Sequence, residues 1–211
     1  MSYLFFYLLI VIIIIVLLLF LGITNSFETF TNICQPIYEP EKWNVKYVQD
    51  SHNCYSYSIN QIEQDRINNC INHVENNKSC GQRGLPRPKK KHEYKHPKNK
   101  KVTCESVTLS VLDDIHNAER LEGKECPQDK YKVALFIDDK HKNFHFLRQD
   151  KCNNPDKIWS HKNVTGPVTQ KDVDGNIIYD VEKANLKYSW VNYDKMCNYL
   201  CIPDDSFLEK N

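Results

Sequence analysis

The chain has 211 residues and a formal net charge of +1 at pH 7, from 28 Lys and Arg against 27 Asp and Glu. This balance argues against broad electrostatic binding of nucleic acid, and the length suits one compact domain with additional segments. No sequence period recurs along the chain, which argues against solenoids and propellers.

The first segment, from Leu4 to Ile23, is almost wholly apolar and contains no charged side chain. A helix of this length crosses a hydrocarbon core of about 30 Å. A cleaved signal peptide is the alternative, but its apolar core is usually about 7–15 residues and ends at a small-x-small site. The exit sequence GITNS fits such a site poorly. We therefore expect residues 1–26 to form a retained single-pass membrane anchor.

The cysteines all lie after this segment, at Cys34, Cys54, Cys70, Cys80, Cys104, Cys126, Cys152, Cys197 and Cys201. Such a density is typical of an oxidising compartment, and an odd number leaves at least one thiol unpaired within the chain. We therefore expect a lumenal or extracellular domain, with the sequons at Asn77 and Asn163 as glycosylation acceptors. Zinc is the competing use of cysteine, but no C-x-x-C pair occurs, so we expect no metal and no cofactor.

Residues 27–50 predict an extended lead-in, because two prolines discourage a long helix. From 55 to about 76, apolar residues recur at steps of three and four, which predicts one helix capped by Ser51 or Asn53. Cys54 would then lie at the positive end of the helix dipole, where the pKa of a thiol falls and its reactivity rises. The alternative is that Cys54 is one more disulfide partner.

Residues 78–101 are rich in Lys, Arg and Pro, with the sequence GQRGLPRPKKKHEYKHPKNKK from residue 81. Prolines break regular structure and like charges repel, so we expect an exposed insertion within the domain. A run of this charge attracts polyanions such as nucleic acid, acidic glycans or anionic lipid, and a solvated loop is the simpler interpretation. The amphipathic pattern at 104–121 then predicts a second helix.

Three strands joined by polar turns are predicted at 131–137, 144–149 and 158–162. His145 lies near the start of the second strand and His161 on the third. Antiparallel pairing of these strands would bring the two histidines close together.

The remaining residues complete a sheet in this prediction. Residues 168–179 contain the sequence DVDGN, which suits a hairpin turn. The aromatic segment at 188–203 predicts a closing strand, and 204–211 a polar tail.

The blocks NCYSYSIN, FHFLRQD, IWSHK and MCNYLCIP resemble a group of papain-like cysteine hydrolases, related to the amidases and endopeptidases of the NlpC type. The resemblance covers 47–59 loosely and 131–203 well, and it extends to membrane-anchored forms encoded by large DNA viruses. It implies that Cys54 is the nucleophile, His145 the base and His161 the residue that orients the imidazole. The basic insertion departs from the compact pattern of that family.

The chemistry of these residues agrees with that assignment. A thiol with a pKa of about 8.5 needs a neighbouring base, and a polar group on the second imidazole nitrogen selects the tautomer of that base. Asp150 and Asn53 are the rival third members, and Asn53 could instead donate its amide to an oxyanion.

We therefore expect an α+β domain at 51–203, in which a papain-like antiparallel sheet packs against helices after one amino-terminal transmembrane helix. The expected function is thiol-dependent hydrolysis of an amide bond in a peptide, peptidoglycan or conjugate. The alternative is a non-enzymatic, disulfide-stapled membrane glycoprotein that binds a partner or forms a viral surface.

Overall fold

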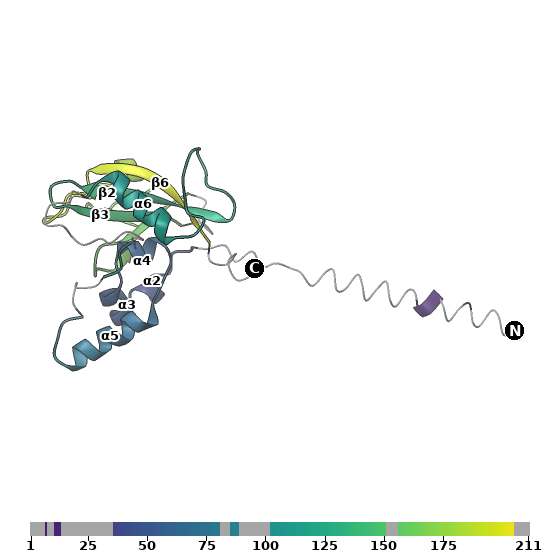
Figure 1. Ribbon diagram of the computed structural model, residues 1–211, viewed down its shortest axis with the longest axis horizontal. Helices are drawn as coiled ribbons and strands as arrows, with labels where there is room; N and C mark the ends of the chain where they lie inside the picture. The colour runs from purple at the N-terminus through teal and green to yellow at the C-terminus, as the bar shows by residue number, and fades with distance from the viewer. Residues whose placement is uncertain are drawn as a thin grey trace. The chain divides into compact units, whose positions relative to one another are not determined.

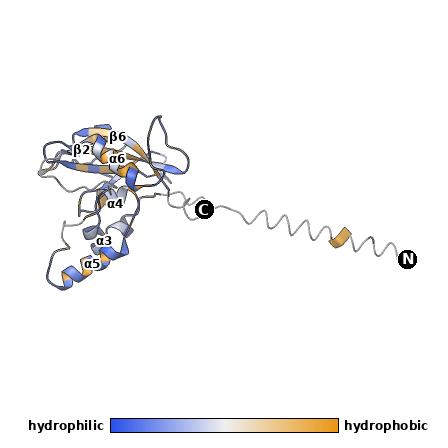
Figure 2. Cartoon of the chain, in the orientation of Figure 1, coloured by the Kyte–Doolittle hydropathy of each residue, from blue (hydrophilic) through white to orange (hydrophobic). Residues whose placement is uncertain are grey.

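The computed structural model describes residues 7, 11–13, 36–80, 85–88, 102–150 and 156–204, and it divides the chain into Met1–Ile33 and Cys34–Asn211. In the first unit the described residues are helical, and Figure 2 shows 11–13 as hydrophobic. Apart from these residues, the predicted membrane segment from Leu4 to Ile23 lies outside the described residues. Within the described ranges, no helix is both long enough and apolar enough to cross a membrane.

The described part of the second unit contains a six-stranded antiparallel sheet in the order β1-β6-β2-β3-β4-β5 (Figure 1). The strands are β1 (Glu119–Arg120), β2 (Lys130–Asp138), β3 (Asn143–Gln149), β4 (Trp159–Lys162), β5 (Val168–Thr169) and β6 (Lys195–Pro203). The helices are α2 (Pro40–Trp43), α3 (Lys46–Ser51), α4 (Cys54–Ser58), α5 (Gln64–Glu75), α6 (Cys104–Asp114) and the 3-10 helix η1 (Val181–Lys183). This arrangement confirms the α+β class.

Strand β2 is the centre of the core because both of its faces are covered. Val133, Leu135 and Ile137 pack in one cluster with residues of α6, whereas Ala134 and Phe136 pack in another with residues 178–193. A strand buried on both faces needs a continuous apolar run, because no side chain faces solvent. Strand β2 has such a run from Val133 to Ile137. In Figure 1, α6 lies across β2 and β3, α4 lies next to them, and α2, α3 and α5 gather on the far side of α4.

The predicted single helix at 55–76 is wrong, because the chain forms α4 and α5 with a break between them. Asn60 in the break has φ = 53°, a left-handed conformation that ends a helix and that asparagine tolerates better than most residues. The amino end of α4 is capped as predicted by Asn53, whose Oδ1 accepts from the backbone N–H groups of Tyr55 and Ser56.

Three other predicted boundaries are corrected. The described part of the predicted extended lead-in, 27–50, contains the helices α2 and α3. Pro40 does not prevent α2, because it occupies the first turn, where a helix tolerates proline. Helix α6 stops at Asp114, not 121, and residues 119–120 pair with β6 instead. The closing strand begins at Lys195, not 188, and Asp204 of the predicted polar tail is buried.

Arg148 of β3 joins the helices to the sheet. Its side chain is 0 % exposed, and its Nη atoms donate to the backbone oxygens of Ile37 (2.7 Å) and Tyr57 (2.9 Å) and to Asn60 Oδ1 (3.0 Å). Its Nε lies 3.4 Å from Asp150 Oδ1, and its guanidinium stacks 3.9 Å from the centre of the Tyr57 ring. Because Tyr57 belongs to α4, this buried cation holds α4 against β3.

Candidate active site

Cys54 is the first residue of α4, and among the described cysteines it is the one outside a disulfide. Its side chain is buried, with 6 % of the residue exposed. The predicted disulfides are present in the described part as Cys70–Cys80, Cys104–Cys197 and Cys126–Cys201. Cys34 and Cys152 lie outside the described residues. The alternative interpretation, in which Cys54 is a disulfide partner, is therefore wrong.

The predicted proximity of the two histidines is confirmed. Leu147 of β3 pairs with His161 of β4, so His145 is the diagonal neighbour of His161 on the same face of the sheet. His145 Nε2 and His161 Nδ1 are 2.9 Å apart, and both rings are almost fully buried. Tyr193 stacks on the His145 ring with 4.8 Å between centres, which holds the imidazole plane in place.

The hydrogen bonds of His161 determine the tautomer of His145. His161 Nε2 lies 3.0 Å from the backbone oxygen of Lys171, which can only accept, so this nitrogen carries the proton. Burial lowers the pKa of both histidines, most strongly that of His145, so both rings are neutral at pH 7. A neutral His161 then has a lone pair on Nδ1, and His145 Nε2–H donates to it. The Nδ1 atom of His145 is left as an unprotonated base.

Cys54 and His145 line the same cleft, which has a volume of about 590 Å³. Its walls come from the start of α4, the start of β3, the loop between β4 and β5, and segments 85–88 and 190–193. The thiol and the base therefore share one solvent-accessible cavity, although they are 91 residues apart in sequence (145 − 54 = 91).

The predicted low pKa of Cys54 is wrong. Burial raises the pKa of this thiol to about 11, while the backbone N–H of Phe146 and the charge of Lys162 pull it down by less. The five residues of α4 form a short helix with a small dipole, whereas the loss of hydration acts on the whole charge of a thiolate. At neutral pH the site therefore holds a neutral thiol and a neutral imidazole, not an ion pair.

We expect iodoacetamide to alkylate Cys54 at pH 7 roughly 10²–10³-fold more slowly than free cysteine, whose pKa is about 8.5. The rate should rise about tenfold per pH unit up to pH 11, because the thiolate is the reacting form and the folded protein raises the pKa. Peptide mass mapping of the unreduced protein measures the rate at Cys54 alone. The control is the protein unfolded in urea, where Cys54 should react like free cysteine. A folded-state rate at pH 6–7 above that of free cysteine would show that an ion pair exists after all.

Lys162 follows His161 in β4 and is 0 % exposed. Its Nζ donates to three backbone oxygens, those of Gln49 (2.7 Å), Val164 (2.9 Å) and Gly166 (2.8 Å). Burial lowers the pKa of Lys162 to about 7. However, the side chain contacts three accepting carbonyls, and only the charged ammonium has three N–H groups to donate to them, whereas a neutral amine has two. We conclude that Lys162 is charged and holds the β4–β5 loop, one wall of the cleft, against α3.

The rival third members make other contacts. Asp150 accepts from Ser160 Oγ (2.7 Å) and Gln170 Nε2 (3.2 Å) and lies beside Arg148, within the buried contacts that join α4 to the sheet. Asn53 caps α4, and its Nδ2 donates to the backbone oxygen of Pro86 at 2.8 Å. One of its two amide N–H groups is therefore engaged, and Asn53 lines the same cleft as Cys54, so donation to an oxyanion stays a prediction.

Several residues of the site were not predicted from the sequence. Arg148, Lys162 and Tyr193 position the site, yet a buried Arg or Lys within a charged segment has no distinguishing local signal. The predicted exposed insertion, 78–101, also needs correction, because Pro86 is buried and Leu85 and Arg87 line the cleft. Residues 81–84 and 89–101 lie outside the described residues.

The two sequons differ in their surroundings. Asn77 is exposed after α5, as a glycan requires, whereas Asn163 lines the cleft. Glycosylation of either remains a prediction.

A site of this composition can take up and return a proton during attack by sulfur. Within the described ranges, no three His, Cys, Asp or Glu side chains converge in a way that would hold a metal ion. Comparison of the chain with protein-family models, curated proteins and solved structures finds no match to any of them.

Proposed function

We propose that this protein is a thiol-dependent hydrolase of amide bonds with a papain-like arrangement of its catalytic groups. The observation that carries the proposal is the hydrogen-bond chain from Lys171 through His161 to His145, which leaves His145 Nδ1 unprotonated. His145 lines the same cleft as the thiol of Cys54, which is in no disulfide. A histidine pair with only a structural role needs no cavity beside a thiol.

The raised pKa of Cys54 determines the order of the proton transfers. His145 Nδ1 takes the proton as Cys54 Sγ attacks the carbonyl carbon, so no free thiolate has to accumulate. The imidazolium then gives this proton to the leaving amine as the C–N bond breaks, which leaves a thioester on Cys54. Water, deprotonated by the same nitrogen, hydrolyses the thioester and restores the thiol. His161 Nδ1 accepts from His145 throughout and stabilises the imidazolium.

An acyl-enzyme on Cys54 is the specific product that tests this function. Incubation of the full chain with p-nitrophenyl acetate is expected to release a burst of p-nitrophenol and to place an acetyl group on Cys54, detectable by intact-protein and peptide mass. Cys54→Ala should abolish both signals. Turnover that is unchanged in Cys54→Ala, or an adduct confined to lysines, would contradict the proposal.

The alternative, a non-enzymatic disulfide-stapled membrane glycoprotein that binds a partner, is favoured by two observations. The first is that the three described disulfides join α5 to the segment after it, α6 to β6, and β6 to the segment before β2, as in stapled extracellular domains. The second is that burial holds Cys54 as the protonated thiol, which is less reactive than the thiolate. In either case we propose an oxidising compartment, supported by the disulfides, for the domain that follows residue 27. Failure of the acyl-enzyme test leaves this alternative standing.

A further inference from the structure

The cleft that contains Cys54 continues into a second cavity of about 240 Å³. The two cavities share Arg87, Asn143 and Phe144 as lining residues. The second cavity is closed on its other side by the first turns of α6. Together they form a groove that extends past the nucleophile in one direction. A groove of this form suits an elongated chain better than a small compact substrate.

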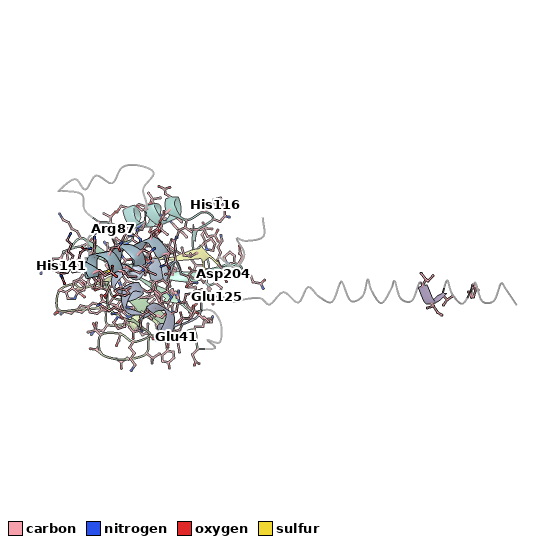
Figure 3. All side chains as sticks on the ribbon, turned by 90° about the horizontal axis from the view of Figure 1, so that it is seen from below. Glu41, Arg87, His116, Glu125, His141 and Asp204 are labelled. Atoms are coloured by element: carbon pink, nitrogen blue, oxygen red, sulfur yellow. A yellow bond between two sulfur atoms is a disulfide. The ribbon has the colours of Figure 1, made fainter. Side chains whose placement is uncertain are left out.

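The charge of this groove is of one sign. None of the described residues that line the two cavities is Asp or Glu, whereas Arg87 and Lys142 both line the second cavity. The chain as a whole carries almost equal numbers of acidic and basic residues, so this exclusion of carboxylates is local. In Figure 3, Arg87 lies toward the same side of the domain as His141, the neighbour of Lys142, and away from His116 and Glu125.

The acidic residues nearest to Lys142 in sequence are already engaged. Asp138 binds the His141 ring at 2.5 Å, and Asp139 pairs with Lys195 at 3.2 Å. Lys142 itself pairs with no carboxylate within the described ranges. Arg87 and Lys142 therefore give this side of the groove a positive field. A cavity with low-dielectric walls concentrates such a field and attracts anionic groups.

The other end of the cleft is uncharged and suits a peptide backbone. Asn163 lines it, and its Oδ1 is buried without a hydrogen-bond partner among the described residues. A buried acceptor that lacks a donor costs free energy, which a substrate N–H would recover. Trp190 also lines this end and is 48 % exposed, which offers a flat apolar surface to a side chain.

From these observations we infer that the groove binds a peptide chain with an acidic side chain on the Arg87–Lys142 side of the amide that Cys54 attacks. This inference rests on the proposed function for the attack and adds the class of substrate. The carboxylate of the peptide lies between Arg87 and Lys142, and a backbone N–H on the far side donates to Asn163.

Internally quenched peptides test this substrate class. Three libraries share one random scaffold and differ at a single scanned position, which is Glu, Gln or Lys, and cleavage products are identified by mass. At one position relative to the cleaved bond, we expect kcat/KM for the Glu library to exceed that for the Gln library by about 5–30-fold. The Lys library should have the lowest kcat/KM of the three. The double variant R87E/K142E should reverse the order of Glu and Lys. K142E alone should remove the preference for Glu in part.

The matched control is K140E, because Lys140 is exposed in the same turn as Lys142 but does not line either cavity. It should leave the order of the libraries unchanged. Equal cleavage of the three libraries, or the same effect in K140E as in K142E, would overturn the inference and leave the hydrolase proposal intact.

Protection of Cys54 from alkylation at pH 9 separates binding from chemistry. If no library is cleaved but Glu peptides protect Cys54 better than Lys peptides, the hydrolase proposal fails and the inferred binding preference stands. If heparin or single-stranded DNA protects Cys54 and Glu peptides do not, the groove is a polyanion site and the inference is wrong. If nothing is cleaved and no peptide protects Cys54, both proposals fail.

Discussion

Under the proposed function, replacing His145 with alanine is expected to lower kcat for ester or peptide hydrolysis by roughly 10²–10⁴-fold, because the attack on the carbonyl would lose its general base. The loss should be large because Cys54 has a pKa of about 11 and supplies almost no thiolate by itself at pH 7. For the same reason, the residual activity of His145→Ala should rise with pH much more steeply than that of the unmodified protein. Steady-state rates between pH 6 and 10 measure both effects.

His161 should act through His145 and not on the substrate. His161→Leu leaves the buried Nε2–H of His145 without an acceptor and permits the wrong tautomer, so we expect kcat to fall by about 10-fold or more with little change in KM. His161→Gln, which can both accept and donate, should recover part of the loss. His116→Ala is the control, since His116 is exposed and lies outside the cleft. Equal activity of the Leu and Gln variants would contradict the positioning role.

Replacing Arg148 with methionine is expected to destabilise the fold by about 3–5 kcal/mol, the cost of leaving a buried charge without its partner. The substitution removes donors to two backbone oxygens and to Asn60, and it leaves Asp150 buried beside an apolar chain. Arg148→Lys should recover little of this, because one ammonium cannot reach acceptors on three sides of the planar guanidinium. Urea unfolding with unchanged slope m measures the loss.

The matched control for Arg148 is Arg120, which binds both carboxylate oxygens of Glu105 at 2.8 and 2.7 Å on the surface. Arg120→Met should cost less than about 1 kcal/mol, since exposed ion pairs contribute little. If the two methionine variants unfold at the same urea concentration, the buried contacts of Arg148 do not stabilise the domain more than the exposed ion pair of Arg120. A stable Arg148→Met with reduced hydrolysis would instead assign Arg148 to the alignment of α4 alone.

Local patterns predicted the strands better than the helices. The three strands at 130–162 were placed within a residue or two, because a continuous apolar run bounded by polar turns has few other solutions. The helix at 55–76 and the carboxyl end of the helix at 104–121 were wrong, since apolar spacing continues across the break at Asn60 and past Asp114. A left-handed residue ends a helix without changing the hydrophobic pattern around it.

In the candidate site, too, some features follow from local sequence patterns and others only from the tertiary structure. The sequence by itself determined that the domain is α+β, that disulfides staple it, and that His145 and His161 lie on neighbouring antiparallel strands, because these follow from residue type and local periodicity. The tertiary structure alone decided that His161 contacts the imidazole, since the register of β3 against β4 brings the two rings together. It also decided that the Cys54 thiol is neutral, because its pKa depends on burial, and burial is produced by segments far apart in the chain.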